Sequence, residues 1–135
     1  MLTETGMSAS IIVCSTCRLD EERREDESGT RGGALFAAAV REAALRRGNS
    51  DIHIEETACF FACSRYCTVQ LRAEGKISYI LGDFRATEAD AEALLDYFEH
   101  YLASENGVVP FRDWPEGVKG HFITRQPPSG HIIGK

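Results

Sequence analysis

The sequence contains no apolar run that approaches the roughly 20 residues a membrane-spanning helix requires. Residues 1–10 lack the basic segment and apolar core of a secretory signal peptide. Basic residues are also outnumbered: the formal net charge is −6, which argues against general nucleic-acid binding. We therefore expect a cytoplasmic protein, in a reducing compartment where cysteine thiols stay free.

Common catalytic and nucleotide-binding motifs are missing as well. The chain has no Gly-rich phosphate loop, no Gly-x-Ser-x-Gly turn and no His-Glu-x-x-His segment. Its histidines show no spacing typical of metal ligands, and His53 stands alone on a predicted strand. These absences favour an electron carrier or a metal-binding protein over an enzyme.

The chain is long enough for one domain with a real core. It has 135 residues, of which 43% are hydrophobic and 9% aromatic, as in ordinary soluble globular proteins. We expect a flexible N-terminus at residues 1–9, a folded domain at residues 10–104 and a C-terminal extension at residues 105–135. The extension is punctuated by glycine and proline, so we predict little regular structure in it.

Cysteine is confined to two clusters. Cys14 and Cys17 lie near the start, and Cys59, Cys63 and Cys67 follow at strict four-residue spacing. Thiolates are soft ligands, and four of them complete either a zinc site or an iron–sulfur site. A free cysteine can also be a small buried hydrophobic residue. Clustering of all five cysteines, an odd number that suits no pure disulfide framework, favours a metal centre.

Both clusters follow predicted strands. Residues 10–13 are apolar and largely β-branched, which predicts a buried strand ending directly on Cys14. Residues 51–56 alternate between apolar and polar side chains, which predicts a second strand leading to Cys59.

A helix is predicted between these strands. It should begin near Gly29, capped by Ser28 or Thr30, and end near Arg47 with Gly48 just beyond. The segment that precedes the helix, residues 18–28, is rich in acidic residues, which predicts a solvated loop. This loop could also dock a basic partner.

The second half of the domain predicts a hairpin and a helix. Residues 68–72 and 77–81 alternate around a turn in which Gly75 supplies a positive φ. Thr87 should cap the last helix, whose apolar stripe must pack on the sheet. The stripe comprises Ala91, Leu94, Leu95, Phe98, Tyr101 and Leu102.

This order of elements predicts a thioredoxin-like α/β fold with a four-stranded mixed sheet, two main helices and an irregular C-terminal extension. Two strands joined through a helix should be parallel, with a right-handed crossover. Their carboxyl ends then lie ~5 Å apart at one edge, which brings the two cysteine clusters together. Phe111, Trp114 and Phe122 should anchor the extension.

The cysteine pattern resembles the thioredoxin-like [2Fe-2S] ferredoxins. The shared features are a strand ending in Cys14, an acidic loop, residues 57–63 with their Cys-x-x-x-Cys, and a turn at residues 73–76. The resemblance implies a [2Fe-2S] cluster. That family places its second cysteine further along, where this chain has residues 27–31 without cysteine.

A more extensive resemblance covers about residues 10–128. It is to a bacterial family of predicted metal-binding proteins, the domain of unknown function 1636. The residues that carry this resemblance are Cys14-Ser-Thr-Cys17-Arg18, the loop of Cys59, Cys63 and Cys67, Gly75-Lys76-Ile-Ser-Tyr79 and Arg125-Gln-Pro-Pro128.

We expect Cys14, Cys17, Cys59 and Cys63 to be the ligands. Cys59 and Cys63 match the ferredoxin-like Cys-x-x-x-Cys, and Cys14 is placed by its strand. The fourth position lies between Cys17 and Cys67, and the Cys-x-x-Cys spacing favours Cys17.

Zinc is the main alternative cofactor, either in a structural site or in a metal-delivery module. Cys14-x-x-Cys17 has a spacing used by zinc ligands, and a four-cysteine site would be closed. Phe60 and Phe61 would instead surround the second loop with a dry shell, which suits a redox cluster. The sequence therefore favours iron–sulfur.

A thioredoxin-like dithiol oxidoreductase is a further alternative, because Cys14-x-x-Cys17 follows a strand. Two features argue against it. The acidic loop separates the pair from the helix N-terminus that would lower a thiol pKa, and Tyr66-Cys67 stands where thioredoxins carry a proline. Whether the site holds an iron–sulfur cluster or zinc, we expect a protein partner for redox or metal handling, with a basic docking patch. A homodimer is a further possibility.

Overall fold

The two strands expected to be parallel lie side by side in a computed structural model of the chain, which describes residues 2–6, 8–49 and 52–134. β1 (Ser10–Cys14) pairs in parallel with β2 (His53–Thr57), with Cys14 opposite Thr57. Every residue of β1 is buried, as its apolar sequence predicts. Five residues of the predicted segments lie outside the described residues: Met1, Met7, Ser50, Asp51 and Lys135.

The predicted hairpin is present. β3 (Val69–Arg72) and β4 (Ser78–Leu81) pair in antiparallel fashion, and β3 also pairs with β1. Gly75 turns the chain between them with φ of +77°, the left-handed conformation that glycine adopts without a Cβ penalty. The hairpin therefore extends the sheet on the side of β1 away from β2.

The sheet has five strands, so the prediction of four was wrong. β5 (Phe122–Gln126) pairs with β4 at the edge, in the order β2-β1-β3-β4-β5. It comes from the extension that was predicted to be irregular. Its first residues are half-buried and its last three exposed, so it lacks the alternation by which a strand is recognised in sequence.

Aromatic residues attach the extension to the core, though not all of those predicted. The rings of Trp114 and Phe122 lie 4.5 Å apart, and Phe122 lies 5.2 Å from the ring of Tyr97, which is fully buried. Phe111 is 62% exposed and contacts Trp114 from outside. Two short 3-10 helices precede β5: η2 (Phe111–Asp113) and η3 (Glu116–Val118).

The first helix begins later than expected. α1 (Gly32–Arg47) starts after Arg31, which makes no side-chain capping bond, so the predicted caps Ser28 and Thr30 were wrong. Both of those residues belong to a turn built on Asp26, whose carboxylate accepts hydrogen bonds from them. The C-terminus is as predicted, because Gly48 adopts a left-handed conformation there.

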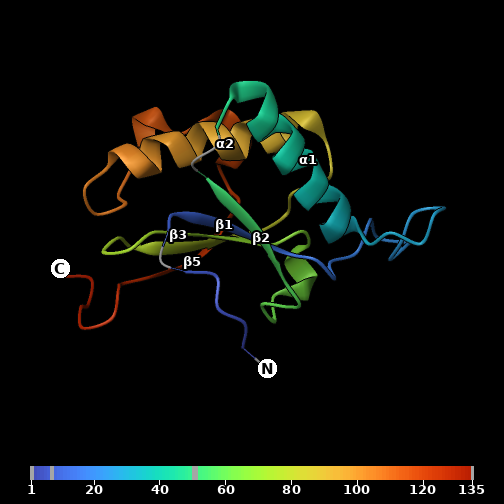
Figure 1. The fold of residues 1–135 in the computed structure, drawn as a ribbon, viewed down its shortest axis with the longest axis horizontal. Coiled ribbons are helices and arrows are strands. Elements are labelled where there is room, and N and C mark those ends of the chain that lie inside the picture. The colour runs from blue at the N-terminus through green and yellow to red at the C-terminus, as the bar shows by residue number, and fades with distance from the viewer. Residues whose placement is uncertain (1, 7, 50–51, 135) are drawn as a thin grey trace.

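The second helix matches its prediction. In α2 (Glu88–Ala103) the Thr87 side chain accepts a hydrogen bond from the Asp90 N–H at 3.1 Å. Of the predicted stripe, all but the half-buried Leu102 are buried. Figure 1 shows α1 and α2 on the same side of the sheet. Neither helix, nor any other in the described ranges, has the length and apolarity to cross a membrane.

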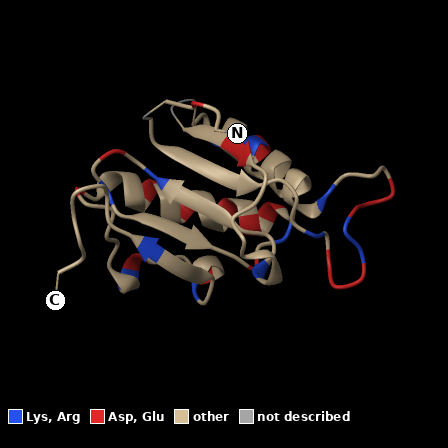
Figure 2. Ribbon diagram, turned by 90° about the horizontal axis from the view of Figure 1, so that it is seen from below, with Lys and Arg blue, Asp and Glu red and all other residues tan. Residues whose placement is uncertain are grey.

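The acidic segment is a solvated loop, as predicted. Residues 18–31 form the loop that protrudes beyond the sheet at the right of Figure 2, and its ribbon carries runs of acidic residues in red and of basic residues in blue. A β-bridge between Glu25 and Arg31 closes the loop, and Asp20 pairs with Arg23 at 3.0 Å. The chain therefore leaves the sheet after Cys14, forms this loop and then enters α1.

Candidate metal centre

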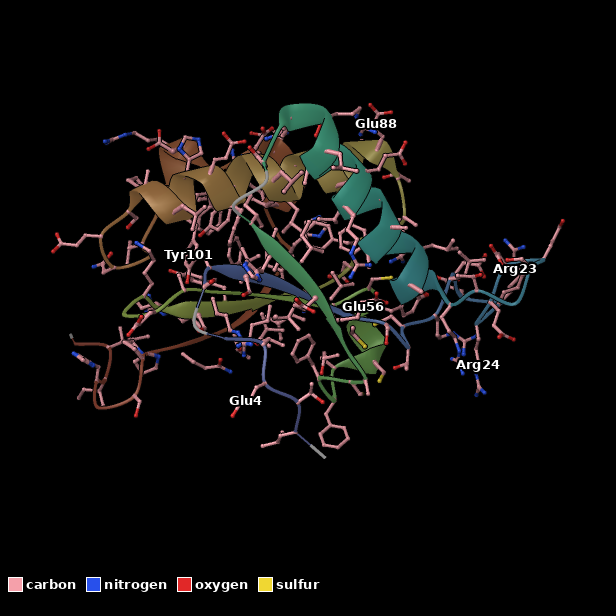
Figure 3. The ribbon with its side chains drawn as sticks, viewed as in Figure 1. Glu4, Arg23, Arg24, Glu56, Glu88 and Tyr101 are labelled. Atoms are coloured by element: carbon pink, nitrogen blue, oxygen red, sulfur yellow. The ribbon has the colours of Figure 1, made fainter. Side chains whose placement is uncertain are left out.

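Three segments meet at one end of the sheet, where β1 ends. The Cys14 N–H donates to the Thr68 carbonyl at 3.0 Å, and the Ser15 N–H donates to the Thr57 carbonyl at 2.8 Å. These bonds join the loop after β1 to the end of β2 and to the start of β3. All five cysteines lie in these segments, and Figure 3 shows the yellow sulfur atoms around the green loop that follows β2.

Three of the thiols form a buried group, Cys14, Cys17 and Cys67. The Cys14 thiol donates to the Ala58 carbonyl at 3.6 Å, and the Cys17 sulfur lies 3.5 Å from the Thr68 hydroxyl. Cys17 interacts with the thiols of both Cys14 and Cys67 and so lies between them. This group will be called the inner thiols.

Cys59 and Cys63 form an exposed pair, the outer thiols. Their sulfur atoms lie 3.5 Å apart. The backbone N–H of Phe61 donates to the Cys59 sulfur at 3.2 Å, and Cys63 begins the short helix η1 (Cys63–Arg65). The loop thus curls so that both outer thiols point to one spot.

The outer and inner thiols influence one another electrostatically. The pKa of the Cys63 thiol is raised, first by its hydrogen bond with Cys59 and by burial, and then by the charges of Cys59, Cys14 and Cys17. The Cys14 thiol also donates to the carbonyl of Ala58, the residue before Cys59, so the loop after β1 lies against the start of the segment that carries the outer thiols.

Proton sharing among the inner thiols shifts their pKa values in opposite directions. The pKa of Cys14 is raised well above its usual range by hydrogen bonding with Cys17 and by burial. The pKa of Cys17 is also raised, because the effect of Cys67 and burial outweighs the lowering by Cys14. The pKa of Cys67 is lowered by its hydrogen bond with Cys17 and, further, by the charge of Arg85.

The N-terminus of α1 lies against the first cysteine pair, contrary to the expectation that the acidic loop separates them. The Gly33 N–H donates to the Cys17 carbonyl at 3.1 Å. A Cβ on Gly33 would come within 1.9 Å of the Cys14 carbonyl oxygen, and one on Gly32 within 2.1 Å of the Arg18 carbonyl oxygen. The sequence carried a signal for this contact. Two successive glycines in the first turn of a helix are unfavourable, so their presence indicates that another segment packs too closely there for a Cβ.

An ion pair attaches the loop that carries the outer thiols, called the outer loop, to the rest of the domain. Arg65 in η1 donates to the Asp83 carboxylate at 2.7 Å, and the Asp83 N–H donates back to the Arg65 carbonyl at 2.7 Å. Arg65 also donates to the Gly120 carbonyl, in the extension, at 3.4 Å. Sequence analysis missed this clamp, because nothing in the local pattern pairs residues so distant in the chain.

The two phenylalanines of the outer loop have different environments. Phe60 is half-buried and packs against the core. Phe61 is 98% exposed, with φ of +59°. The prediction that both would shield the site was therefore wrong for Phe61, which turns outward while its N–H points to Cys59.

The donor set fits a soft metal ion or an iron–sulfur cluster, because five thiols gather here. Within the described ranges, no three His, Cys, Asp or Glu side chains are already arranged around a common ion position. His121 has a structural role instead: its Nδ1 lies 2.7 Å from the Gly82 carbonyl, and its ring stacks on Phe84.

Comparisons with known proteins give the family and the type of fold. Residues 11–128 match the family described as "Protein of unknown function (DUF1636)". No curated protein matches the sequence. A thioredoxin-like [2Fe-2S] ferredoxin from Aquifex aeolicus is similar in structure, with a TM-score of 0.53 and 17% identity, over 94% of this chain and 100% of that chain. This likeness confirms the predicted type of mixed α/β fold.

Proposed function

Because the chain belongs to the family described as protein of unknown function (DUF1636), and has the fold of a thioredoxin-like ferredoxin, we propose that it is a small cysteine-ligated metalloprotein holding a [2Fe-2S] cluster. It would serve in electron transfer or in metal-dependent assembly. The observation that carries the proposal is the convergence of all five thiols from three segments at one end of the sheet.

We propose Cys14, Cys17, Cys59 and Cys63 as the ligands. The hydrogen bond of Cys14 to Ala58, next to Cys59, supports this set, as does the effect of the Cys14 and Cys17 charges on Cys63. Cys67 is the competing fourth ligand, because it too contacts Cys17 in the buried group.

A cluster held by these thiols would supply one-electron redox chemistry. The chain's own contribution is to hold the inner thiols rigidly between β1, β3 and α1, and to keep water from them. Phe60 adds apolar surface beside the outer thiols. The partner we propose is a protein with a basic patch, which the exposed carboxylates of residues 18–31 would attract.

A zinc-binding or metal-delivery protein is the second candidate. The observation that favours delivery is the exposure of the outer thiols, whose sulfur atoms lie 3.5 Å apart. A structural zinc site is normally closed by four buried ligands. A dithiol oxidoreductase at Cys14 and Cys17 is less well supported, because the pKa of both thiols is raised rather than lowered.

Purification without oxygen tests the cofactor. We expect a red-brown protein with visible charge-transfer absorption, and iron and acid-labile sulfide in equal amounts. A colourless protein that holds one equivalent of zinc would replace the iron–sulfur proposal with the zinc alternative.

Serine substitution at each cysteine tests the ligand set, since serine cannot replace a thiolate for these metals. We expect Cys14→Ser, Cys17→Ser, Cys59→Ser and Cys63→Ser to lose the cluster and Cys67→Ser to retain it. Far-ultraviolet circular dichroism of each variant shows whether it has folded. A Cys67→Ser protein that is empty, beside a Cys17→Ser protein that stays coloured, would exchange these two cysteines in the assignment.

A further inference from the structure

We propose that the outer thiols, Cys59 and Cys63, are a thiol–disulfide exchange site that a low-molecular-weight disulfide such as glutathione disulfide closes reversibly. We also propose that closure prevents metal binding. This second statement rests on the proposed function, whereas the first concerns the metal-free protein alone.

The geometry of the outer loop carries the proposal. The sulfur atoms of Cys59 and Cys63 are 3.5 Å apart, and a disulfide requires about 2.05 Å. Both side chains are exposed, and Phe61 between them points into solvent. Small side-chain rotations therefore bring the sulfur atoms into bonding distance, with no buried group in the way.

Selectivity follows from burial. The inner thiols also contact one another, but Cys14, Cys17 and Cys67 are almost completely buried. Exchange begins with the approach of a bulky disulfide in line with the attacking sulfur. An oxidant of that size reaches the outer thiols and not the inner ones.

Cys59 is assigned as the attacking thiol and Cys63 as the resolving one. The Phe61 N–H donates to the Cys59 sulfur at 3.2 Å and holds that sulfur at the exposed surface of the loop, where a disulfide can approach it. The Cys59 thiolate attacks one sulfur of glutathione disulfide, which forms a mixed disulfide and releases one glutathione thiolate. Cys63 loses its proton to water and attacks the Cys59 sulfur, which forms the intramolecular bond and releases the second glutathione thiolate. The protein loses two electrons and two protons, and one glutathione disulfide becomes two glutathiones.

Closure would act on the metal centre directly. A disulfide sulfur carries no negative charge and is a poor ligand for zinc or iron, so two of the four proposed ligands are lost together. The inner thiols remain reduced, and reduced glutathione restores the pair. The site would thus accept metal only while the surrounding thiol pool is reducing.

The exchange is tested on reduced, metal-free protein incubated with glutathione disulfide. Acid quenching, alkylation of the remaining thiols under denaturing conditions and peptide mass spectrometry then locate the oxidised residues. We expect a disulfide between Cys59 and Cys63, three alkylated inner thiols and complete reversal by reduced glutathione. A disulfide among the inner thiols, or five alkylated thiols, would overturn the proposal.

Two variants separate the steps. Cys63→Ser should stop at the mixed disulfide with glutathione on Cys59, because no resolving thiol is left. Leu45→Ser, at an exposed position of α1 outside the cysteine segments, is the control and should form the Cys59–Cys63 disulfide at the wild-type rate. A wild-type protein that also stops at the mixed disulfide would show that the outer thiols do not close.

A separate measurement of metal binding distinguishes a failure of this inference from a failure of the proposed function. Reduced and oxidised wild-type proteins are titrated with Zn²⁺ against a chromophoric chelator, and we expect tight binding only to the reduced form. Equal binding to both forms would overturn the coupling. A reduced protein that binds neither zinc nor a cluster would defeat the proposed function and the coupling, while the disulfide result stands on the mass spectra.

Discussion

Gly33 shows how much a single residue decides at the candidate metal centre. It lets the first turn of α1 contact the Cys14 carbonyl closely enough for its N–H to bond the Cys17 carbonyl. Intrinsic helix propensity would favour alanine here by about 1 kcal/mol. The close contact therefore outweighs propensity at this position.

We predict that Gly33→Ala destabilises the protein, against the trend of helix propensity. The new Cβ would lie 1.9 Å from a backbone oxygen, and backbone cannot move aside by changing a rotamer. We expect a loss of about 1–3 kcal/mol in the free energy of unfolding, measured by urea denaturation. The Cys14 thiol should also be alkylated faster, because the loop shifts.

Gly134→Ala is the control for this prediction. No atom lies within 4 Å of the position that a Cβ on Gly134 would take, and Gly134 lies outside the helices and strands. The free energy of unfolding of the Gly134→Ala variant should therefore equal that of the wild type. If Gly33→Ala proved as stable as the wild type or more so, the close approach of α1 to the cysteine loop would be wrong.

At the level of elements, two arginine clamps perform different tasks. Arg47, at the end of α1, binds Glu92 at 2.9 Å, Asp96 at 2.6 Å and also Glu99, all on α2. Arg65, in η1, binds Asp83 after β4. The first joins the two helices far from the cysteines, and the second holds the segment that begins with Cys63.

We predict that Arg65→Met weakens Zn²⁺ binding by about 10–100-fold, as loss of a residue that orients a ligand typically does. The pair is partly exposed, so its loss should cost less than about 1 kcal/mol of stability. Asp83→Asn keeps a hydrogen-bond acceptor and should have a smaller effect. Competition with a chromophoric chelator measures the affinity.

Arg47→Met is the matched control for the Arg65 variant. It removes an arginine clamp of similar chemistry and should lower the free energy of unfolding by about 1 kcal/mol, because the side chain is only 21% exposed and serves three carboxylates. Zinc affinity should stay at the wild-type value. Equal losses of affinity in the two variants would mean that Arg65 acts on general stability and not on Cys63.

At the scale of the whole molecule, an aromatic cluster joins the sheet, α2 and the extension. Tyr79, Tyr97 and Tyr101 surround the same region, and the rings of Tyr97 and Phe122 lie 5.2 Å apart. Burial raises the pKa of all three tyrosines above its ordinary value of 10.0. The folded state thus retains protons that the unfolded chain releases at alkaline pH.

We predict that this cluster makes the fold sensitive to alkali. Because the folded-state pKa of Tyr97 is raised, its contribution is complete below pH 10 and is lost as the pH rises above that value. Each such tyrosine adds a slope of up to about 1.4 kcal/mol per pH unit. Tyr97→Phe should reduce the slope with which the free energy of unfolding falls at alkaline pH by about that amount, as measured by urea denaturation at a series of pH values. An unchanged slope would contradict the raised pKa of Tyr97.

The sequence by itself determined the strands β1 to β4, the two main helices and the end of the fold at which the cysteines gather. β-branched residues before Cys14, alternation before Cys59, Gly75 in its turn and Thr87 at its cap each act through near neighbours along the chain. Local sterics and hydrogen bonding therefore sufficed to predict them. The convergence of the two clusters followed from the rule that parallel strands end at one edge.

Only the tertiary structure decided the features that depend on distant residues. β5 forms because β4 offers an open edge, and the Arg65–Asp83 clamp joins residues that no periodicity connects. The division into inner and outer thiols likewise depends on which cysteine side chains β3 and α1 cover. The spacing of the cysteines along the chain does not indicate which of them are covered. Burial is a property of the packed molecule, so it appears only when all the elements are in place.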